Sequence, residues 1–238
     1  MSISGFNASA SALQAFLVRQ DVTANNLANV STPGFKRSSA SLADRRSSGV
    51  DVADIREDPR QGPLDTATNP FDLAIEGEGF FKVQAPEGTR YVRAGVFGLD
   101  ANRELVTPQG FRLSPSIQVP QNASGFAVQG DGSVLALNPD GSQSPIGQVT
   151  LTRFPNPSGL LKAGGGAYAP FTSAGVPRDG IPGTGGFGSL RTGALEDSNV
   201  DLAEETVASI RDLRAFQVNA KMIRVQDEML GTLLDIRH

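Results

Sequence analysis

Two glutamates, Glu76 and Glu78, come closest to a catalytic pair in this sequence. Carboxylates two residues apart share one face of an extended strand, at about 7 Å, a spacing that suits acid/base hydrolysis of a glycosidic bond. Gly77 and Gly79 alternate with them, however, and glycines in this pattern indicate a turn rather than a strand. We therefore interpret this segment as a turn without catalytic function.

A second candidate is the glycine-rich stretch at residues 183–188, which reads GTGGFG and fits the pattern G-x-G-x-x-G. A dinucleotide site needs this loop between a buried strand and a helix whose N-terminus faces the pyrophosphate. Here Ile181-Pro182 precedes the loop, and the strand-like residues SLRTGAL follow it. The sequence therefore predicts a flexible loop and no bound cofactor.

Metal and nucleophile chemistry has little support in the sequence. The single histidine is the last residue, His238, and the sequence contains no cysteine. His-based triads, multi-histidine metal sites and thiolate metal sites all need residues that are missing here. We expect no catalytic, cofactor-binding or metal-binding residues, and the protein is predicted not to be an enzyme.

Composition narrows the class of protein further. The formal net charge is −4 and no dense Lys/Arg block occurs, which argues against nucleic-acid binding. No apolar run approaches the roughly 18 residues of a membrane span, so we expect no membrane insertion. Residues 1–20 have neither a cationic start nor a continuous apolar run, and we expect no cleaved secretory signal.

The elements that carry most of the information are two long helices at the ends of the sequence. Residues 198–201, SNVD, predict the start of the C-terminal helix, because Ser and Asp side chains cap helix N-termini. Beyond this start the apolar residues fall into two stripes on different sides of the helix. The first stripe contains Leu213, Phe216, Ala220, Ile223, Leu230 and Leu234, and the second contains Val218, Met222, Val225, Met229, Leu233 and Ile236.

A helix that is apolar on two sides must be covered on two sides. The N-terminal helix can supply one cover, and we infer that other copies or relatives of this chain supply the second. The alternative interpretation is a core helix that is covered by loops and sheet of its own domain.

The N-terminal helix is predicted from an alternating spacing of three and four residues, which is typical of a coiled-coil seam. The positions are Ile3, Phe6, Ala10, Leu13, Leu17, Gln20, Ala24 and Leu27, and seven of the eight are apolar. Pro33 and Gly34 must lie beyond the helix end. Residues 1–37 and 197–238 are thus predicted to form a coiled-coil stem.

Between the two helices the sequence contains two segments with different residue patterns. Residues 38–68 are polar and lack apolar periodicity, which indicates an extended connector. Residues 69–196 contain short runs rich in Val, Leu and Phe, separated by turn signals, and indicate an antiparallel all-β domain. Within that domain, residues 155–188 are expected to be a loop and residues 190–196 a last strand. The predicted fold class is α+β, with an antiparallel β domain inserted between two stem helices.

Three motifs resemble one known family. Residues 24–37 read ANNLANVSTPGFKR, which is similar to the N-terminal signature of the bacterial flagellar axial proteins, namely rod, hook and hook-associated subunits. Residues 61–81 contain QGPL and NPFDLAIEGEGFF, which resemble the entry to the β domain of rod and hook proteins. Residues 198–205, SNVDLAEE, are similar to the start of their C-terminal helix. Overall size and the EGEGFF run favour a rod protein over the larger hook protein.

The resemblance implies a structural subunit of the flagellar basal-body rod that polymerises through its terminal helices into the axial drive shaft. Members of the family are exported unfolded through the flagellar type III channel, which implies a place in the periplasm-spanning rod without a cleaved signal peptide. The implied partners are further copies of the chain, other rod and hook subunits, the export apparatus and surrounding ring proteins. The expected assembly-interface residues are Leu13, Leu17, Asn25, Asn26, Leu27, Asn29, Phe35, Leu213, Phe216, Ile223, Val225 and Leu230.

Two questions stay open at this point. Asparagines are good backbone hydrogen-bonders, so Asn25, Asn26 and Asn29 fit either an ordered contact with a neighbour or a capping loop within the chain. The connector is short for a distal-rod or hook protein, which leaves the subtype open. The alternatives to a rod subunit are a hook or hook-associated protein and a rod-assembly factor such as a cell-wall hydrolase.

Overall fold

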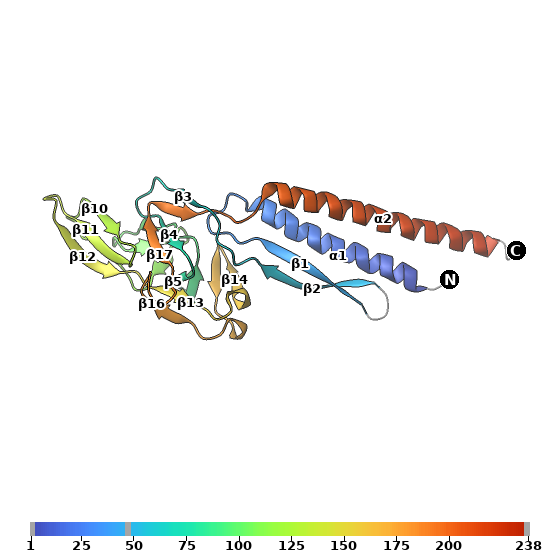
Figure 1. The fold of residues 1–238 in the computed structure, drawn as a ribbon, viewed down its shortest axis with the longest axis horizontal. Helices are drawn as coiled ribbons and strands as arrows, with labels where there is room; N and C mark the ends of the chain where they lie inside the picture. The colour runs from blue at the N-terminus through green and yellow to red at the C-terminus, as the bar shows by residue number, and fades with distance from the viewer. Residues whose placement is uncertain (1–2, 46–48, 236–238) are drawn as a thin grey trace. The chain divides into compact units, whose positions relative to one another are not determined.

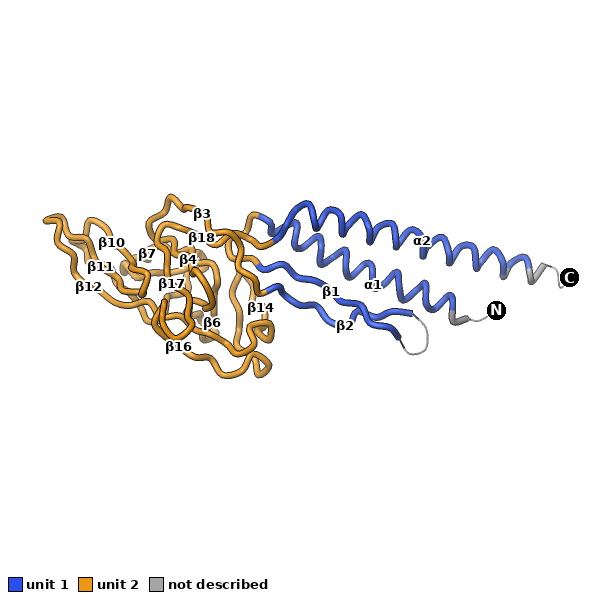
Figure 2. Tube along the Cα trace, viewed as in Figure 1, with its two compact units in different colours: residues 1–30, 36–58, 200–238 blue, residues 31–35, 59–199 orange. Residues whose placement is uncertain are grey.

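The structure, a computed structural model, describes residues 3–45 and 49–235 and divides the chain into two compact units (Figures 1 and 2). The helical unit consists of residues 1–30, 36–58 and 200–238. The β unit consists of residues 31–35 and 59–199. Both units are therefore discontinuous in sequence.

Helix α1 spans Ile3–Ala28. It contains no proline, and its single glycine, Gly5, lies near its start, so nothing in its interior opposes the helical conformation. Beyond its end the N–H of Asn29 donates to the carbonyl of Asn26 at 3.1 Å, and Gly34 adopts a φ of 68°. The predicted helix end before the Pro33-Gly34 turn is confirmed.

Helix α2 spans Leu202–Asp235. The carboxylate of Asp201 accepts hydrogen bonds from the backbone N–H groups of Ala203 and Glu204, at 2.8 and 3.0 Å. Asp201 is therefore the N-cap, and acidic residues in the first turn favour the positive end of the helix dipole. The helix start predicted at residues 198–201 is confirmed.

The helical unit also contains a β-hairpin, formed by β1 (Ser38–Asp44) and β2 (Val50–Glu57). The sequence had indicated only an extended connector over residues 38–68. The hairpin escapes prediction because its strands are polar and mostly exposed, so they show no clean alternation. It packs on α1, where the hydroxyl of Ser11 accepts a hydrogen bond from the N–H of Val50 at 3.1 Å.

Helices α1 and α2 lie side by side and run antiparallel (Figure 1). Gly5 near the start of α1 lies against Gln226 near the end of α2, whereas Asn26 at the end of α1 contacts Glu205 at the start of α2. Terminal helices with a β domain between them in sequence give the α+β class that was predicted.

The β unit is entirely antiparallel. Its strands are β3 (Leu64–Thr66), β4 (Leu73–Glu76), β5 (Phe80–Ala85), β6 (Gly88–Val92), β7 (Gly98–Leu99), β8 (Leu105–Val106), β9 (Arg112–Leu113), β10 (Gly125–Val128), β11 (Ser133–Leu137), β12 (Gln143–Gln148), β13 (Leu151–Arg153), β14 (Leu161–Gly164), β15 (Ala167–Ala169), β16 (Arg178–Gly180), β17 (Ser189–Thr192) and β18 (Ala194–Glu196). Two short 3-10 helices, η1 (Pro157–Gly159) and η2 (Thr172–Ala174), complete it.

These strands form one large sheet and several small ones (Figure 1). The large sheet has the order β14-β15-β6-β5-β9-β8-β7; β13 also pairs with β5, and β16 pairs with β13. A separate three-stranded sheet has the order β10-β11-β12. The last two strands of the unit pair with its first two, β17 with β4 and β18 with β3. The unit begins at residue 59 rather than 69, because β3 pairs with the last strand.

The core of the β unit is a continuous apolar cluster. Its large members are fully buried, among them Leu73, Phe81, Phe97, Leu113 and Leu151. The rings of Phe81 and Phe97 meet edge to face, with centroids 5.2 Å apart. The apolar residues of the strands are therefore buried within the unit itself.

A buried ion pair reinforces the same unit. Arg93 Nε lies 2.6 Å from Glu196 Oε2, and both side chains are almost completely buried. The remaining guanidinium nitrogens of Arg93 donate to the carbonyls of Gly79, Ile75 and Gly77 at 2.6 to 3.1 Å. The pair is therefore fully hydrogen-bonded, and it joins β18 to the loop between β4 and β5.

The turn at Gly77 and Gly79 and the segment 155–188 were both predicted to lack regular structure. Gly77 and Gly79 adopt φ values of 114° and 143°, so the turn predicted at the two glutamates is confirmed. The loop predicted over residues 155–188 is wrong in part, because this segment contains β14, β15 and β16. These strands are only three or four residues long, so they carry almost no periodic signal.

Candidate assembly interface

Polar groups join α1 and α2 at several points. Arg19 Nη2 lies 3.0 Å from Asp212 Oδ1, and Gln20 Nε2 donates to Ser209 Oγ at 2.9 Å. Asp212 is only 3% exposed, and its Oδ2 atom is buried with no hydrogen-bond partner in the described part of the chain. Burial raises the pKa of the Asp212 carboxyl, because desolvation disfavours the charged form more than the nearby arginines favour it.

A second polar cluster lies at the end of α1 and is centred on Asn26, which is 1% exposed. Its Nδ2 donates to the carbonyl of Ser38 at 2.8 Å and to Glu205 Oε2 at 3.1 Å, and its Oδ1 accepts from the N–H of Ser38 at 2.9 Å. Arg37 also pairs with Glu205, and this hydrogen bond raises the pKa of Arg37. Asn26 thus joins α1, β1 and α2 within one chain.

The other residues of the first motif also make contacts within the chain. The side chain of Asn29 donates to the carbonyl of Asn25 at 2.9 Å, while Asn25 itself is exposed. Phe35 belongs to the β unit, where Lys162 Nζ lies 5.4 Å from its ring centroid. The role of these residues between copies stays a prediction.

The apolar residues predicted as the seam of α1 are exposed or half-buried where the structure describes their side chains. Leu17 is 53% exposed and Phe6 is also exposed, whereas Leu13 and Leu27 are half-buried. The residues that α1 buries are small or polar instead: Ser9, Ser11, Ala15, Thr23 and Asn26. Small side chains let the hairpin and α2 approach closely. The structure therefore does not confirm this seam as a coiled-coil contact within the chain, although Gln20 of the seam contacts α2.

Helix α2 likewise has half-buried apolar residues and large apolar residues that are exposed. Phe216 and Ile223 are half-buried, on the side of the helix that carries Asp212 toward α1. The exposed large apolar residues are Leu202, Val207, Ile210, Leu213, Val218, Met222, Val225 and Met229. The side chains of Leu230, Leu233, Leu234 and Ile236 lie outside the described residues.

Sequence reasoning missed the polar residues at the helix contact. Glu205, Asp212, Asn219 and Gln226 recur at intervals of seven along α2. Three of them, Glu205, Asp212 and Gln226, contact α1. This heptad of polar residues was visible in the sequence, but a search for apolar periodicity passes over it.

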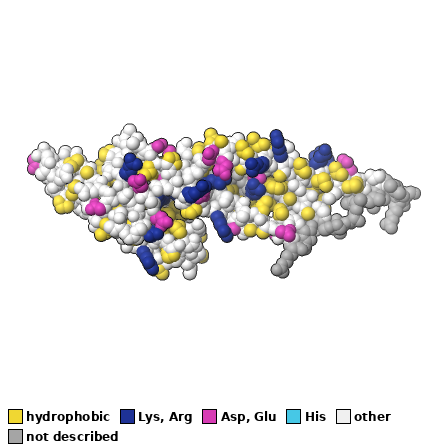
Figure 3. Space-filling model, in the orientation of Figure 1, with side chains coloured by type: hydrophobic (Ala, Val, Ile, Leu, Met, Phe, Trp, Pro, Cys, Tyr) yellow, Lys and Arg dark blue, Asp and Glu magenta, His cyan; other side chains and the backbone are white. Residues whose placement is uncertain are grey.

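Basic side chains lie next to the exposed apolar residues of α2. Arg214, Lys221 and Arg224 are exposed on α2 close to Val218 and Val225. Figure 3 shows hydrophobic and basic side chains next to each other on the visible face of the helical unit. A contiguous exposed apolar surface rimmed by polar groups is typical of a protein–protein contact.

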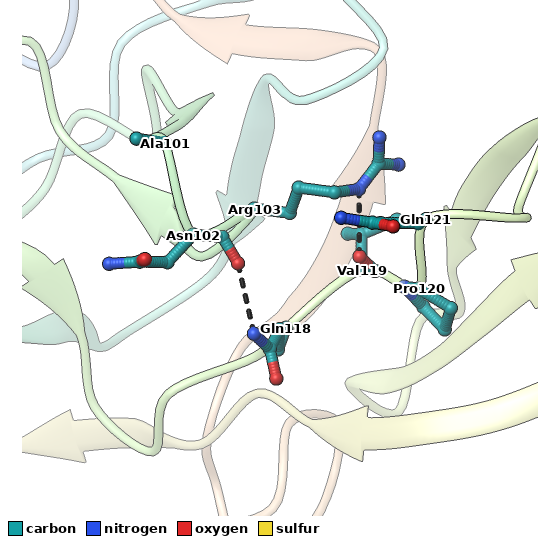
Figure 4. Close-up of a pocket in the computed structure, with 7 residues that line it drawn as sticks. All are labelled: Ala101, Asn102, Arg103, Gln118, Val119, Pro120 and Gln121. Carbon is teal, nitrogen blue, oxygen red and sulfur yellow. Dashed lines mark hydrogen bonds between the residues drawn. The ribbon is translucent and has the colours of Figure 1, made fainter.

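The β unit offers no comparable chemistry in its described residues. A shallow pocket of about 530 Å³ is lined by Ala101, Asn102, Arg103, Gln118, Val119, Pro120 and Gln121 (Figure 4). Arg103 Nε donates to the carbonyl of Val119 at 2.9 Å, and Gln118 Nε2 donates to that of Asn102 at 3.0 Å. These bonds tie two loops together, and no nucleophile or carboxylate pair lines the pocket.

Metal-ligand clusters and membrane-spanning helices are both absent from the part of the chain that the structure describes. Residues 3–45 and 49–235 contain no group of three or more His, Asp or Glu side chains arranged to hold a metal ion. Neither α1 nor α2, over its described part, combines the length and the apolar character needed to cross a lipid bilayer.

Three protein-family models match the chain, and all describe flagellar axial proteins. The model "Flagella basal body rod protein" matches residues 6–36. The model "Flagellar hook protein FlgE/F/G D1 domain" matches residues 74–136, within the β unit. The model "Flagellar basal body rod FlgEFG protein C-terminal" matches residues 191–236, which include α2.

Curated relatives are similar over almost the full length. The flagellar basal-body rod protein FlgG of Borreliella burgdorferi is 36% identical over 252 residues, which cover 93% of this chain and 94% of the relative. FlgG of Bacillus subtilis is 34% identical over 254 residues, covering 95% and 96% respectively. The chain therefore belongs to the flagellar basal-body rod protein family. It is a structural subunit of the rod, and its place is in the flagellar basal body.

The hook alternative is not favoured by these similarities. The hook protein FlgE of Escherichia coli is 38% identical, but over only 118 residues. That match covers 50% of this chain and 29% of the hook protein. The rod proteins, by contrast, match from one end of the chain to the other.

Proposed function

We propose that this rod subunit polymerises through its terminal helices into the axial drive shaft. The observation that carries the proposal is the exposed apolar stripe on α2, formed by Val218, Met222, Val225 and Met229. Burial of apolar surface contributes roughly 25 cal/mol per Å², so a stripe of this kind favours association with other subunits. The stripe lies on the side of α2 that α1 leaves uncovered.

The coiled coil predicted from the spacing belongs, in this proposal, to the assembled rod rather than to the single chain. Phe6 and Leu17 of α1 are exposed at the positions where a coiled-coil seam would place them. Contacts with neighbouring copies, and with other rod and hook subunits, would complete that seam. Some of the twelve residues expected at the interface, such as Asn26, would then make contacts within one chain. Others, such as Leu17 and Val225, would make contacts between copies.

We further propose export through the flagellar type III channel, without a cleaved signal peptide, and contact with the surrounding ring proteins. This part rests on the family to which the chain belongs. It predicts that the mature chain starts with the same residues as the synthesised one. Mass spectrometry of the subunit from purified basal bodies would test that expectation, and a truncated N-terminus would contradict it.

The experiment that tests polymerisation is Val225→Asp in a strain that lacks its own copy of the chain. A carboxylate that is buried without a partner costs several kcal/mol, so the variant should be made and exported but should not enter rods. The strain should therefore be non-motile, and electron micrographs of its basal bodies should show incomplete rods.

Val176→Asp is the matched control. Val176 is 77% exposed in a loop of the β unit, so the same chemical change there should leave motility unchanged. If the Val225→Asp strain swims like the parent, the α2 stripe faces water in the rod and the proposed polymerisation surface is wrong.

A further inference from the structure

Helix α2 contains a groove that includes Val225 of the exposed stripe. It has a volume of about 490 Å³ and is lined by Phe216, Gln217, Ala220, Lys221, Arg224, Val225 and Glu228. The groove exists because Ala220, which has only a methyl side chain, lies one turn from two large side chains, Phe216 and Arg224. Its floor is therefore apolar, and its rim is charged.

The charge at this rim is mainly positive and is not neutralised by the chain itself. Lys221 and Arg224 have no ion pair among the described residues. Glu228 is the one carboxylate in the lining, so the groove carries two cations and one anion. A partner that suits it combines an apolar side chain with a carboxylate about one helical turn away.

Helix α1 carries that combination on its own free side. Leu17 is 53% exposed, and Asp21 follows four residues later on the same face and is also exposed. Asp21 has no ion-pair partner among the residues that the structure describes. Arg19 and Gln20, by contrast, contact α2 of the same chain, so Leu17 and Asp21 cannot reach the groove of their own chain.

One subunit thus presents two different, complementary faces. A contact between unlike faces is heterologous, and it leaves one free face on each side for the next copy. Such a contact propagates into a ring or a helical filament. An isologous contact, which pairs two identical faces, would close after two copies.

We propose that Leu17 of one copy inserts into the α2 groove of the next copy, while Asp21 pairs with Lys221 and Arg224 there. The proposal rests on polymerisation through the terminal helices and specifies the partner face. An anionic membrane surface would also suit a basic, apolar helix face. A second copy is favoured because it uses both free faces and accounts for the unpaired carboxylate on α1.

The test is a charge exchange between two variants, Asp21→Lys and the double substitution Lys221→Asp/Arg224→Asp. Either variant, expressed alone in a strain without its own copy, should abolish swimming, because like charges then meet at every contact. Co-expression should restore swimming. In an alternating polymer the reversed α1 face meets the reversed groove, and the two native faces meet at the next contact.

Matched controls change the net charge equally at exposed sites elsewhere. Asp44→Lys on β1, and Arg178→Asp/Arg191→Asp in the β unit, should each swim without a second variant. The absence of cysteine allows a direct second measurement that tolerates weak function. Leu17→Cys in one copy and Ala220→Cys in another should give a bismaleimide-linked dimer in isolated basal bodies, whereas Leu17→Cys with Val176→Cys should not.

Three results would overturn the proposal. Normal swimming of either variant alone means that the two faces do not meet. Rescue only when all three substitutions are in one chain, and not by co-expression, means that the contact is intramolecular. Loss of binding to anionic vesicles by the groove variant, without rescue by co-expression, assigns the groove to a membrane. In each case, if the Val225→Asp subunit does not enter rods, the proposed polymerisation through the terminal helices still stands.

Discussion

The helical unit and the β unit of this rod protein use apolar residues in opposite ways. The β unit buries Phe81, Phe97 and Leu113 in one continuous cluster. The helical unit buries Asn26, Glu205 and Asp212 and leaves large apolar side chains of α2 in water. The first arrangement is complete in a single chain, whereas the second leaves surface that only another molecule can cover.

One ion pair from each unit shows the same difference. Arg93 and Glu196 in the β unit have several further hydrogen bonds to backbone groups. Arg19 and Asp212 in the helical unit leave Oδ2 of Asp212 buried without a partner in the described chain. A satisfied network makes a unit rigid, and a partly satisfied one lowers the cost of opening it. At the Arg19–Asp212 pair, therefore, the helical unit is less completely satisfied than the β unit is at Arg93 and Glu196.

The largest effect is expected from Arg93→Met. Removing one partner of a buried pair leaves the other charge uncompensated, which typically costs about 3–5 kcal/mol. Chemical denaturation of the full chain, followed by circular dichroism in the β region, should show this loss in the β unit. Arg93→Lys, which keeps the charge but loses the fork of donors, should lie between the parent and Arg93→Met. A loss below about 1 kcal/mol would contradict the role given to this pair.

The paired replacement Arg19→Met/Asp212→Leu should have a smaller effect of opposite sign. Apolar side chains in place of a poorly satisfied buried pair often stabilise by about 1–4 kcal/mol, and partial exposure of Arg19 favours the low end of that range. The gain should appear as slower hydrogen exchange of α1 and α2 in the free subunit. If the double variant exchanges faster than the parent, the polar contact stabilises the helix pair and the contrast between the units is weaker.

Loss of the α2 cap should cost about 1 kcal/mol. Asp201→Ala removes two hydrogen bonds to the first turn of the helix, and substitutions of this type cost roughly 0.5–2 kcal/mol. Exchange should accelerate in the first turns of α2 and stay unchanged in the β unit. Asp201→Asn is the control, because an asparagine side chain also caps, and it should behave like the parent. Equal exchange in the Ala variant would show that packing alone sets the helix start.

The smallest effect is a pH dependence of the helix pair. The pKa of Asp212 is raised in the folded chain, so folding favours its protonated form. Its contribution is fully present below the unfolded pKa of about 4 and is lost as pH rises through the raised pKa. The difference in α2 hydrogen exchange between the parent and Asp212→Asn, measured across this pH range, isolates the effect from other carboxylates. A difference that is constant with pH would contradict it.

The sequence predicted those parts of the fold whose signals are local. The N-cap at Asp201, the end of α1 before Pro33 and the glycine turn at Gly77 and Gly79 each depend on a few adjacent residues. Most strands of the β unit follow from short apolar runs and turn signals. The β1–β2 hairpin and strands β14 to β16 were missed, because polar or short strands depend on partners that are distant in sequence.

The candidate site was predictable only as a set of apolar faces. Periodicity identified Leu17 and Val225 as positions on a helix face, and both are exposed in the chain. Periodicity cannot say what covers a face, and Leu17 of the predicted seam is exposed within the single chain. Asn26 was found through the family motif, yet its contacts to Ser38 and Glu205 needed the three-dimensional arrangement.

The most direct measurement compares hydrogen exchange of the free subunit with that of the subunit in isolated basal bodies. Amides of α2 from residue 213 to 229 should exchange far faster in the free subunit, since neighbours are absent and large apolar side chains of α2 are exposed. Amides of β5 and β13 should be equally protected in both samples, because the β unit has a complete core. Equal protection of α2 in both samples would mean that the helical unit is already complete in a single chain.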